Sequence, residues 1–221
     1  MSFGTYARTV RNEQLPPSRR HAALRCAVGH YCPLGFNATW AYVTATARPS
    51  PDIRRDTSAL LRALDALDTS RSVWLQDTEA FASTRQTEKA AGRRSPRPAD
   101  MARFVMPQWP SRTTPSRLGL VAAVANRQTW FRALPFPDET LSSDVQASRL
   151  AAVRTSLDNS AAEYLAQLGR LDSTGRHSLS TAVQTLHQTV HPGYSPLNTY
   201  VLPWLRFANL LNYVARTQHD L

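Results

Sequence analysis

Apolar residues recur at intervals of three and four along much of the chain, and this spacing predicts helices. In the segment 148–165 the apolar stripe consists of Leu150, Val153, Leu157, Ala161 and Leu165. Comparable stripes predict helices in the middle of the chain over residues 36–47, 51–81, 114–127 and 141–171. At about 1.5 Å per residue, the last of these is expected to be one continuous helix about 45 Å long.

Other segments lack this period or interrupt it. Residues 1–36 are rich in arginine and show no sustained period, so they are expected to form an N-terminal arm. Glycine and proline in residues 87–100 predict a charged linker, and residues 102–109 indicate a short extended piece. After Gly175 the pattern predicts a short amphipathic helix and then an aromatic-rich helix interrupted near Pro203.

Together these elements predict an all-α protein with three parts. The central part, residues 37–176, is expected to be a four-helix bundle that includes the short extended segment. The arm 1–36 precedes this core, and residues 177–221 form a C-terminal helical extension. A chain of 221 residues is long enough to bury one substantial core of this kind.

The composition adds an excess of positive charge. Hydrophobic residues make up 42% of the chain and charged residues 19%, as in a globular protein, but 26 basic residues face 16 acidic ones. The formal net charge is therefore +10, and Lys89 is the single lysine. A GC-rich genome would explain the scarcity of lysine but not the net charge. Because arginine forms bidentate contacts with phosphate, we expect a polyanionic partner such as nucleic acid.

Several of the charged residues lie in and beside the connection between the third and fourth of these predicted helices, residues 114–127 and 141–171. The residues of this predicted tip and of the helix start beyond it are Arg127, Arg132, Asp138, Glu139, Arg149 and Arg154. Guanidinium groups beside a helix N-terminus, whose N–H groups also attract anions, form a suitable site for phosphate. The alternative is a solvated loop in which Arg132 pairs with Asp138 or Glu139, and Arg154 forms a surface pair with Asp158.

The order of these features resembles that of the coat proteins of rod-shaped plant RNA viruses, the tobacco mosaic virus-like family. The segments "ARFVMP", "SRLGLVAAVANRQTWFR", "DETLSSD" and "AVRTSLDNSAAEYL" follow one another within residues 103–176. They are similar to the family's extended Arg-Phe-Pro segment, its first radial helix ending in arginines, its inner carboxylate loop and its long second radial helix. Residues 37–102 match the family's two slewed helices only loosely.

The resemblance implies a role for each charged residue. Arg127 and Arg132 would contact phosphates, and Arg154 would lie on the RNA-facing surface of the second radial helix. Asp138 and Glu139 would be the assembly carboxylates, whose mutual repulsion opposes assembly. Where the family has adjacent arginines followed by two aspartates, this chain has Arg149 alone.

The function implied is that of a viral capsid protein that assembles helically around single-stranded RNA. Its expected partners are RNA and further copies of itself, and its expected location is the virion, with the host cytoplasm during assembly. A non-polymeric basic nucleic-acid-binding or packaging protein is the main alternative. A viral matrix-type protein acting on acidic lipid is another. No apolar run approaches the length of a membrane-spanning helix, and no lipidation signal is present, so no membrane partner is expected.

The sequence contains little that predicts catalysis or metal binding. It has no glycine-rich phosphate loop, nucleophile elbow or Cys/His nucleophile pair, so we expect neither an enzyme nor a cofactor. His21, Cys26, His30 and Cys32 lie near one another in the sequence, but their spacing fits none of the usual zinc patterns. We therefore expect two reduced thiols here and no metal site.

Overall fold

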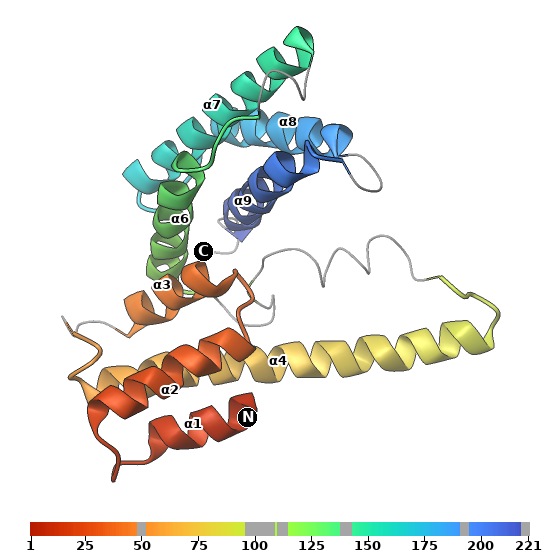
Figure 1. Ribbon diagram of the computed structural model, residues 1–221. Coiled ribbons are helices and arrows are strands. Elements are labelled where there is room, and N and C mark those ends of the chain that lie inside the picture. Colours follow the sequence, from red (N-terminus) through yellow and green to blue (C-terminus); the bar gives the residue numbers. More distant parts are fainter. Residues whose placement is uncertain (48–51, 96–108, 110–114, 138–142, 191–194, 218–221) are drawn as a thin grey trace. The chain divides into compact units, whose positions relative to one another are not determined.

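The computed structural model describes residues 1–47, 52–95, 109, 115–137, 143–190 and 195–217. Within these residues all regular structure is helical, which confirms the predicted all-α class. In chain order the helices are α1 (Phe3–Arg11), α2 (Pro17–His30), α3 (Phe36–Thr46), α4 (Thr57–Ala90), α6 (Arg117–Arg132), α7 (Asp144–Ala166), α8 (Ser173–Thr189) and α9 (Asn198–Arg216) (Figure 1). None of the helices in these ranges has both the length and the apolarity needed to cross a membrane.

The chain divides into two compact units, Met1–Gly119 and Leu120–Leu221. The first unit contains α1 to α4 and the start of α6, and the second contains the rest of α6 and α7 to α9. The single four-helix bundle predicted for residues 37–176 is not confirmed, because α3 and α4 belong to the first unit whereas α6 beyond Gly119 and α7 belong to the second.

The first unit corrects the prediction of an N-terminal arm over residues 1–36. Ser2 caps α1 by accepting a hydrogen bond from the backbone N–H of Thr5, and one face of α1 is buried through Phe3, Ala7 and Val10. Pro17 stands at the first turn of α2, where its missing N–H costs nothing. Both helices pack against α4 as well as against each other. The prolines therefore start a packed helix instead of marking unstructured chain.

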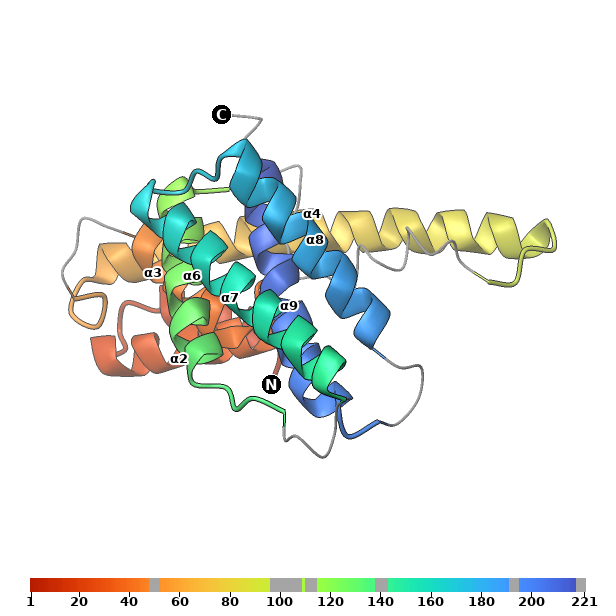
Figure 2. The same ribbon diagram turned by 90° about the horizontal axis from the view of Figure 1, so that it is seen from above.

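Helix α4 begins and ends later than the sequence pattern predicts. Its N-cap is Asp56, whereas the helix was predicted to start at residue 51, and the Asp56 side chain accepts a hydrogen bond of 3.0 Å from the N–H of Ala59. The helix runs to Ala90 and so includes the start of the predicted linker. Nearly all of its buried residues lie in its first half, and the second half extends beyond α1, α2 and α3 (Figures 1 and 2).

The extended piece predicted at residues 102–109 lies outside the described residues except for Trp109. Trp109 is buried and stacks on Tyr42 of α3 with the ring centroids 4.1 Å apart. The Tyr42 hydroxyl in turn accepts a hydrogen bond of 2.7 Å from the N–H of Ser116. Burial is the main reason that the pKa of Tyr42 rises to about 12, so this hydroxyl stays protonated at neutral pH.

The second unit corrects the prediction of one helix over residues 141–171. Helix α7 ends at Ala166, and Leu168 and Gly169 follow with positive φ values of 51° and 96°. The Gly169 N–H donates to the Tyr164 carbonyl at 2.7 Å, which closes the last turn of the helix. Asp172 then caps α8. Glycine just past a helical stripe was the sequence signal for this end.

Helices α8 and α9 form the core of the second unit and are not an extension of another core. Both pack on α7, and the largest fully buried side chain is that of Trp204 in α9. Phe131 of α6 meets Phe207 of α9 with ring centroids 4.7 Å apart and meets Trp204 edge-on at 6.0 Å. Helix α9 continues through Pro203, where an interruption was predicted. The predicted boundary at residues 176 and 177 therefore runs through a packed unit.

Candidate nucleic-acid interface

The predicted tip is described from its arginines, since Asp138 and Glu139 lie outside the described residues. Its polar centre is Asp158 on α7. One Asp158 carboxylate oxygen accepts hydrogen bonds from Arg132 Nε at 2.7 Å and from Gln128 Nε2 at 2.8 Å. Arg132 thus pairs with a carboxylate 26 residues ahead on the next helix, and this interaction joins the end of α6 to the middle of α7.

Arg154 is held by the same corner of the second unit. Its Nη2 donates to the carbonyls of Arg132 at 3.2 Å and Leu134 at 2.9 Å, at and just after the end of α6. Its guanidinium carbon lies 5.6 Å from the Trp204 ring centroid and 5.9 Å from that of Phe131. These contacts show that Arg154 closes the C-terminus of α6 and covers the aromatic core.

Asp158 is the carboxylate in this network whose protonation is shifted. Partial burial opposes its ionisation, but hydrogen bonds from Arg132 and Gln128 and the positive charges of Arg132 and Arg154 outweigh it. The pKa of Asp158 is therefore lowered. The same pairing raises the pKa of Arg132. The network is an ionised pair at neutral pH, which leaves less of the Arg132 charge for an external phosphate.

The other two predicted arginines lie apart from this network. Arg127 is half-buried, with its guanidinium carbon 4.9 Å from the ring centroid of Trp130 on the same helix. Arg149 is exposed near the start of α7, and within the described ranges its side chain has no recorded hydrogen bond or ion pair. The structure thus brings together Arg132 and Arg154, and it places Arg127 and Arg149 outside their network.

The positive charge of the chain is concentrated in the first unit. Residues 1–119 contain eighteen basic residues and nine acidic ones, a formal charge of +9. Residues 120–221 contain eight basic residues and seven acidic ones, a formal charge of +1. Nonspecific binding to a polyanion follows the density of positive charge, so the first unit is the better candidate for the interface.

Some arginines of the first unit stabilise its fold. Arg11 donates to Asp65 at 3.2 Å and to Asp68 at 2.9 Å, which ties α1 to α4. Arg62 donates to the Ala47 carbonyl at 2.8 Å and so closes α3. Arg20 is buried and donates from Nε to the Val10 carbonyl at 2.6 Å, which closes α1.

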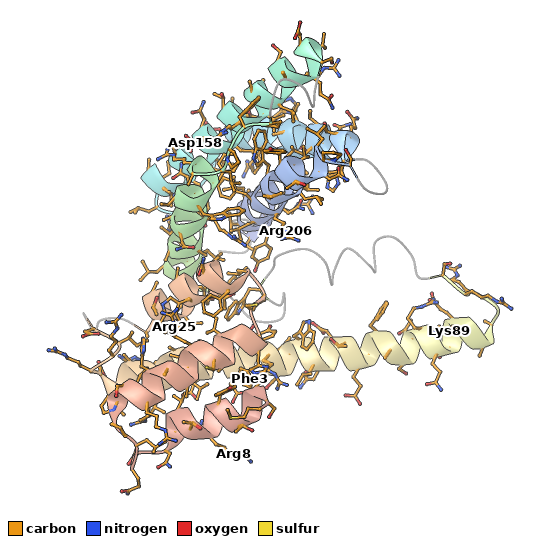
Figure 3. The ribbon with its side chains drawn as sticks, in the orientation of Figure 1. Phe3, Arg8, Arg25, Lys89, Asp158 and Arg206 are labelled. Atoms are coloured by element: carbon orange, nitrogen blue, oxygen red, sulfur yellow. The ribbon has the colours of Figure 1, made fainter. Side chains whose placement is uncertain are left out.

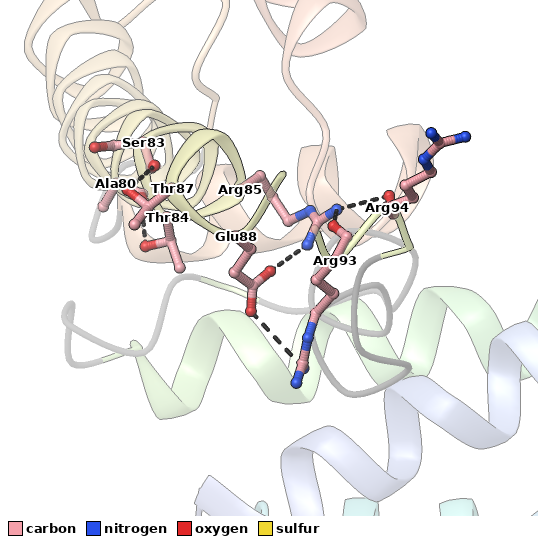
Figure 4. A network of polar contacts seen from close by, with 8 residues as sticks. All are labelled: Ala80, Ser83, Thr84, Arg85, Thr87, Glu88, Arg93 and Arg94. Atoms are coloured by element: carbon pink, nitrogen blue, oxygen red, sulfur yellow. Dashed lines mark hydrogen bonds and ion pairs between the residues drawn. The ribbon is translucent and has the colours of Figure 1, made fainter. Parts of the chain in front are cut away.

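A further network closes the far end of α4 (Figure 4). Arg85 is buried, forms an ion pair with Glu88, and donates to the carbonyls of Arg93 at 3.2 Å and Arg94 at 2.9 Å. Arg93 lies 4.0 Å from the second oxygen of Glu88. The chain after the helix is therefore folded back onto its last turn, and it carries the exposed side chains of Arg93 and Arg94 there.

The face that α2 and α3 share combines exposed charge with aromatic rings. Arg25 is exposed, and its guanidinium carbon lies 5.5 Å from the Trp40 ring centroid and 5.8 Å from that of Phe36 (Figure 3). His21, one turn before Arg25, meets Trp40 almost perpendicularly at 5.3 Å. Arg54 stands close enough for its charge to act on His21.

Sequence reasoning missed this face because it treated residues 1–36 as an arm. The available signal was the spacing of His21 and Arg25, four residues apart, so that they share one side of a helix. The sequence pattern of His21, Cys26, His30 and Cys32 had been interpreted only in terms of zinc binding. His21 contacts Trp40, and His30 contacts Tyr6 with ring centroids 5.3 Å apart. Across the described ranges, no three His, Cys, Asp or Glu residues lie together as a metal site.

Comparison of the chain with protein-family models, with curated proteins and with solved structures finds no match.

Proposed function

We propose that this protein binds single-stranded RNA and that it does so mainly through its first unit. The observation that carries the proposal is the division of charge, +9 in residues 1–119 against +1 in residues 120–221. Binding of this kind is electrostatic and tolerant of sequence. For single strands the logarithm of the affinity falls with the logarithm of salt concentration by about 0.7 for each phosphate neutralised.

The fuller form of the proposal is a viral capsid protein that assembles helically around the RNA, in the virion and in the host cytoplasm. It is supported by helices α3, α4, α6 and α7, which follow one another in the order that the coat-protein resemblance implies. In this form the second unit, with little net charge, supplies contacts between copies. A non-polymeric RNA-packaging protein shares the binding surface and differs only in self-association. Neither form needs a cofactor or catalysis.

Two measurements on the full chain test these proposals. Titration of labelled single-stranded RNA at several salt concentrations is expected to give tight binding at low salt and a steep loss as salt rises. Negative-stain electron microscopy, with and without RNA, is expected to show rods, discs or filaments. If the protein binds RNA but does not assemble under any salt or pH condition, the capsid proposal is wrong and the non-polymeric RNA-packaging protein is supported. Absence of RNA binding at low salt would contradict both.

A further inference from the structure

The α2–α3 face has features that a general basic surface does not require. We call it the Trp40 platform and define it as His21, Arg25, Phe36, Trp40 and Arg54. We propose that the Trp40 platform is a nucleotide subsite, at which one unpaired base stacks on the Trp40–Arg25 surface and the adjoining phosphate binds Arg25 and Arg54. This inference rests on the proposed function, because it assigns a particular place on the first unit to the bound RNA.

The aromatic part of the platform consists of rings that are half-buried. Trp40 and Phe36 are half-buried in α3, so each anchors on the core and leaves part of its ring at the surface. His21 packs edge-on against Trp40 at an interplanar angle of 86°, an arrangement that aromatic pairs favour. Bases of single-stranded nucleic acids stack on such half-exposed rings and on the planar guanidinium groups beside them.

The charge of the platform is suited to a phosphate. Arg25 and Arg54 are both exposed, and neither has a recorded ion pair in the described part of the chain. The carboxylate that acts on His21 is Asp52, and it is already engaged by Arg55 at 3.6 Å and by the backbone N–H of Arg54 at 2.9 Å. The local balance is therefore positive.

His21 acts here as an uncharged aromatic partner at neutral pH. Partial burial is the main cause that lowers its pKa, and the charges of Arg54 and Arg25 lower it further, whereas Asp52 opposes them. A neutral imidazole packs against the indole as an aromatic ring, so the positive charge of the platform comes from the two arginines. Arg25 thus belongs both to the stacking surface and to the phosphate-binding groups, whereas Arg54 belongs to the phosphate-binding groups alone.

The experiment compares two labelled probes on the full chain: an oligouridylate of about ten nucleotides and a ribose-phosphate oligomer of equal length without bases. Because a stacked base contributes strongly, the wild-type protein is expected to bind the base-bearing probe about tenfold more tightly. Trp40→Leu is expected to abolish that preference, because leucine keeps an apolar side chain but has no aromatic ring. Arg25→Gln is expected to weaken both probes and to lower the salt slope by about 0.7.

Arg8→Gln is the matched control for charge. Arg8 is exposed on α1, on the side of α2 away from α3 (Figure 3). Its substitution by glutamine removes one positive charge from the first unit, as Arg25→Gln does. Circular dichroism melting of each variant confirms that the helices are retained. If Trp40→Leu unfolds the unit, Trp40→Phe, which keeps a smaller ring, is expected to retain part of the base preference.

Failure of the inference and failure of the proposed function are distinguishable. If wild-type protein binds neither probe at low salt, the proposed function is wrong. If it binds both probes equally, or if Trp40→Leu and Arg25→Gln match Arg8→Gln, the Trp40 platform is not a nucleotide subsite, although RNA binding stands. Loss of binding to phosphatidylserine vesicles in these two variants, with RNA binding unchanged, would also overturn the proposal and assign the platform to anionic lipid.

Discussion

Both units use arginines to hold their helices together, and they differ in net charge. In the second unit, Arg132 and Arg154 are held by Asp158, by backbone carbonyls and by aromatic rings, and the net charge is +1. In the first unit, Arg11, Arg20 and Arg62 are held in similar ways, but the net charge is +9. Arginines that close helices or pair with carboxylates within the fold are therefore poor predictors of phosphate contacts. Only the remaining arginines indicate a polyanionic partner.

The largest expected effect is on RNA affinity. A triple variant of exposed arginines in the first unit, Arg19→Gln, Arg25→Gln and Arg54→Gln, is expected to weaken binding about a hundredfold at low salt and to reduce the salt slope by about 2. The matched triple variant in the second unit is Arg149→Gln, Arg170→Gln and Arg206→Gln, all exposed. It is expected to weaken binding much less in the same titration. Equal losses in the two variants would remove the distinction between the units.

The next effect is on stability. Arg154→Ala leaves two carbonyls at the end of α6 without their donor and uncovers Phe131 and Trp204. We expect the free energy of unfolding to fall by about 2 kcal/mol, measured by urea denaturation. Arg149→Ala on the same helix is the control and is expected to change it by less than about 0.5 kcal/mol. A large loss of RNA binding in a folded Arg154→Ala protein would show that Arg154 takes part in RNA binding, as the sequence predicted.

A smaller effect depends on pH. Because the pKa of Asp158 is lower in the folded protein, its contribution to stability is complete above the unfolded value of about 3.9 and is lost as the pH falls below that value towards the folded pKa. Asp158→Asn is expected to lower stability at pH 7 by about 1 kcal/mol, given that the pair is partly exposed to solvent. At pH 3 the difference from wild type should shrink. A difference that is unchanged across this range would show that the ion pair does not stabilise the second unit.

The smallest effect concerns the end of α7. Leu168 has a φ of 51° and is 67% exposed, so it adopts a left-handed conformation without burying its side chain. Leu168→Gly is expected to raise the free energy of unfolding by about 0.5 kcal/mol, because glycine reaches this conformation without strain. Thermal melting at pH 7 measures this. Destabilisation instead would mean that the Leu168 side chain contributes packing that outweighs the backbone strain.

The sequence predicted the helices best where a stripe stood between clear ends. The helix predicted over 36–47 is α3, Phe36–Thr46, and the aromatic-rich terminal segment is α9. Helices α1 and α2 were not predicted, because their apolar faces are short and the pattern is interrupted by arginines and prolines. The division at Gly119 depends on contacts between residues far apart in the sequence, which no local pattern contains.

The candidate interface was predictable in composition but not in place. An excess of arginine predicts a polyanionic partner from the sequence alone. Which arginines remain for that partner depends on tertiary contacts such as that between Arg132 and Asp158, which join different helices. Arg25 and Trp40 likewise come together only because α2 packs on α3.

Ultraviolet cross-linking would show whether RNA binds to the first unit, as we propose. Single-stranded RNA would be cross-linked to the full chain by ultraviolet light, and the modified peptides would be identified by mass spectrometry. We expect the cross-links to fall within residues 1–119, including peptides that contain Trp40. Cross-links confined to residues 120–221, around Arg127 and Arg149, would contradict it and return the interface to the predicted tip.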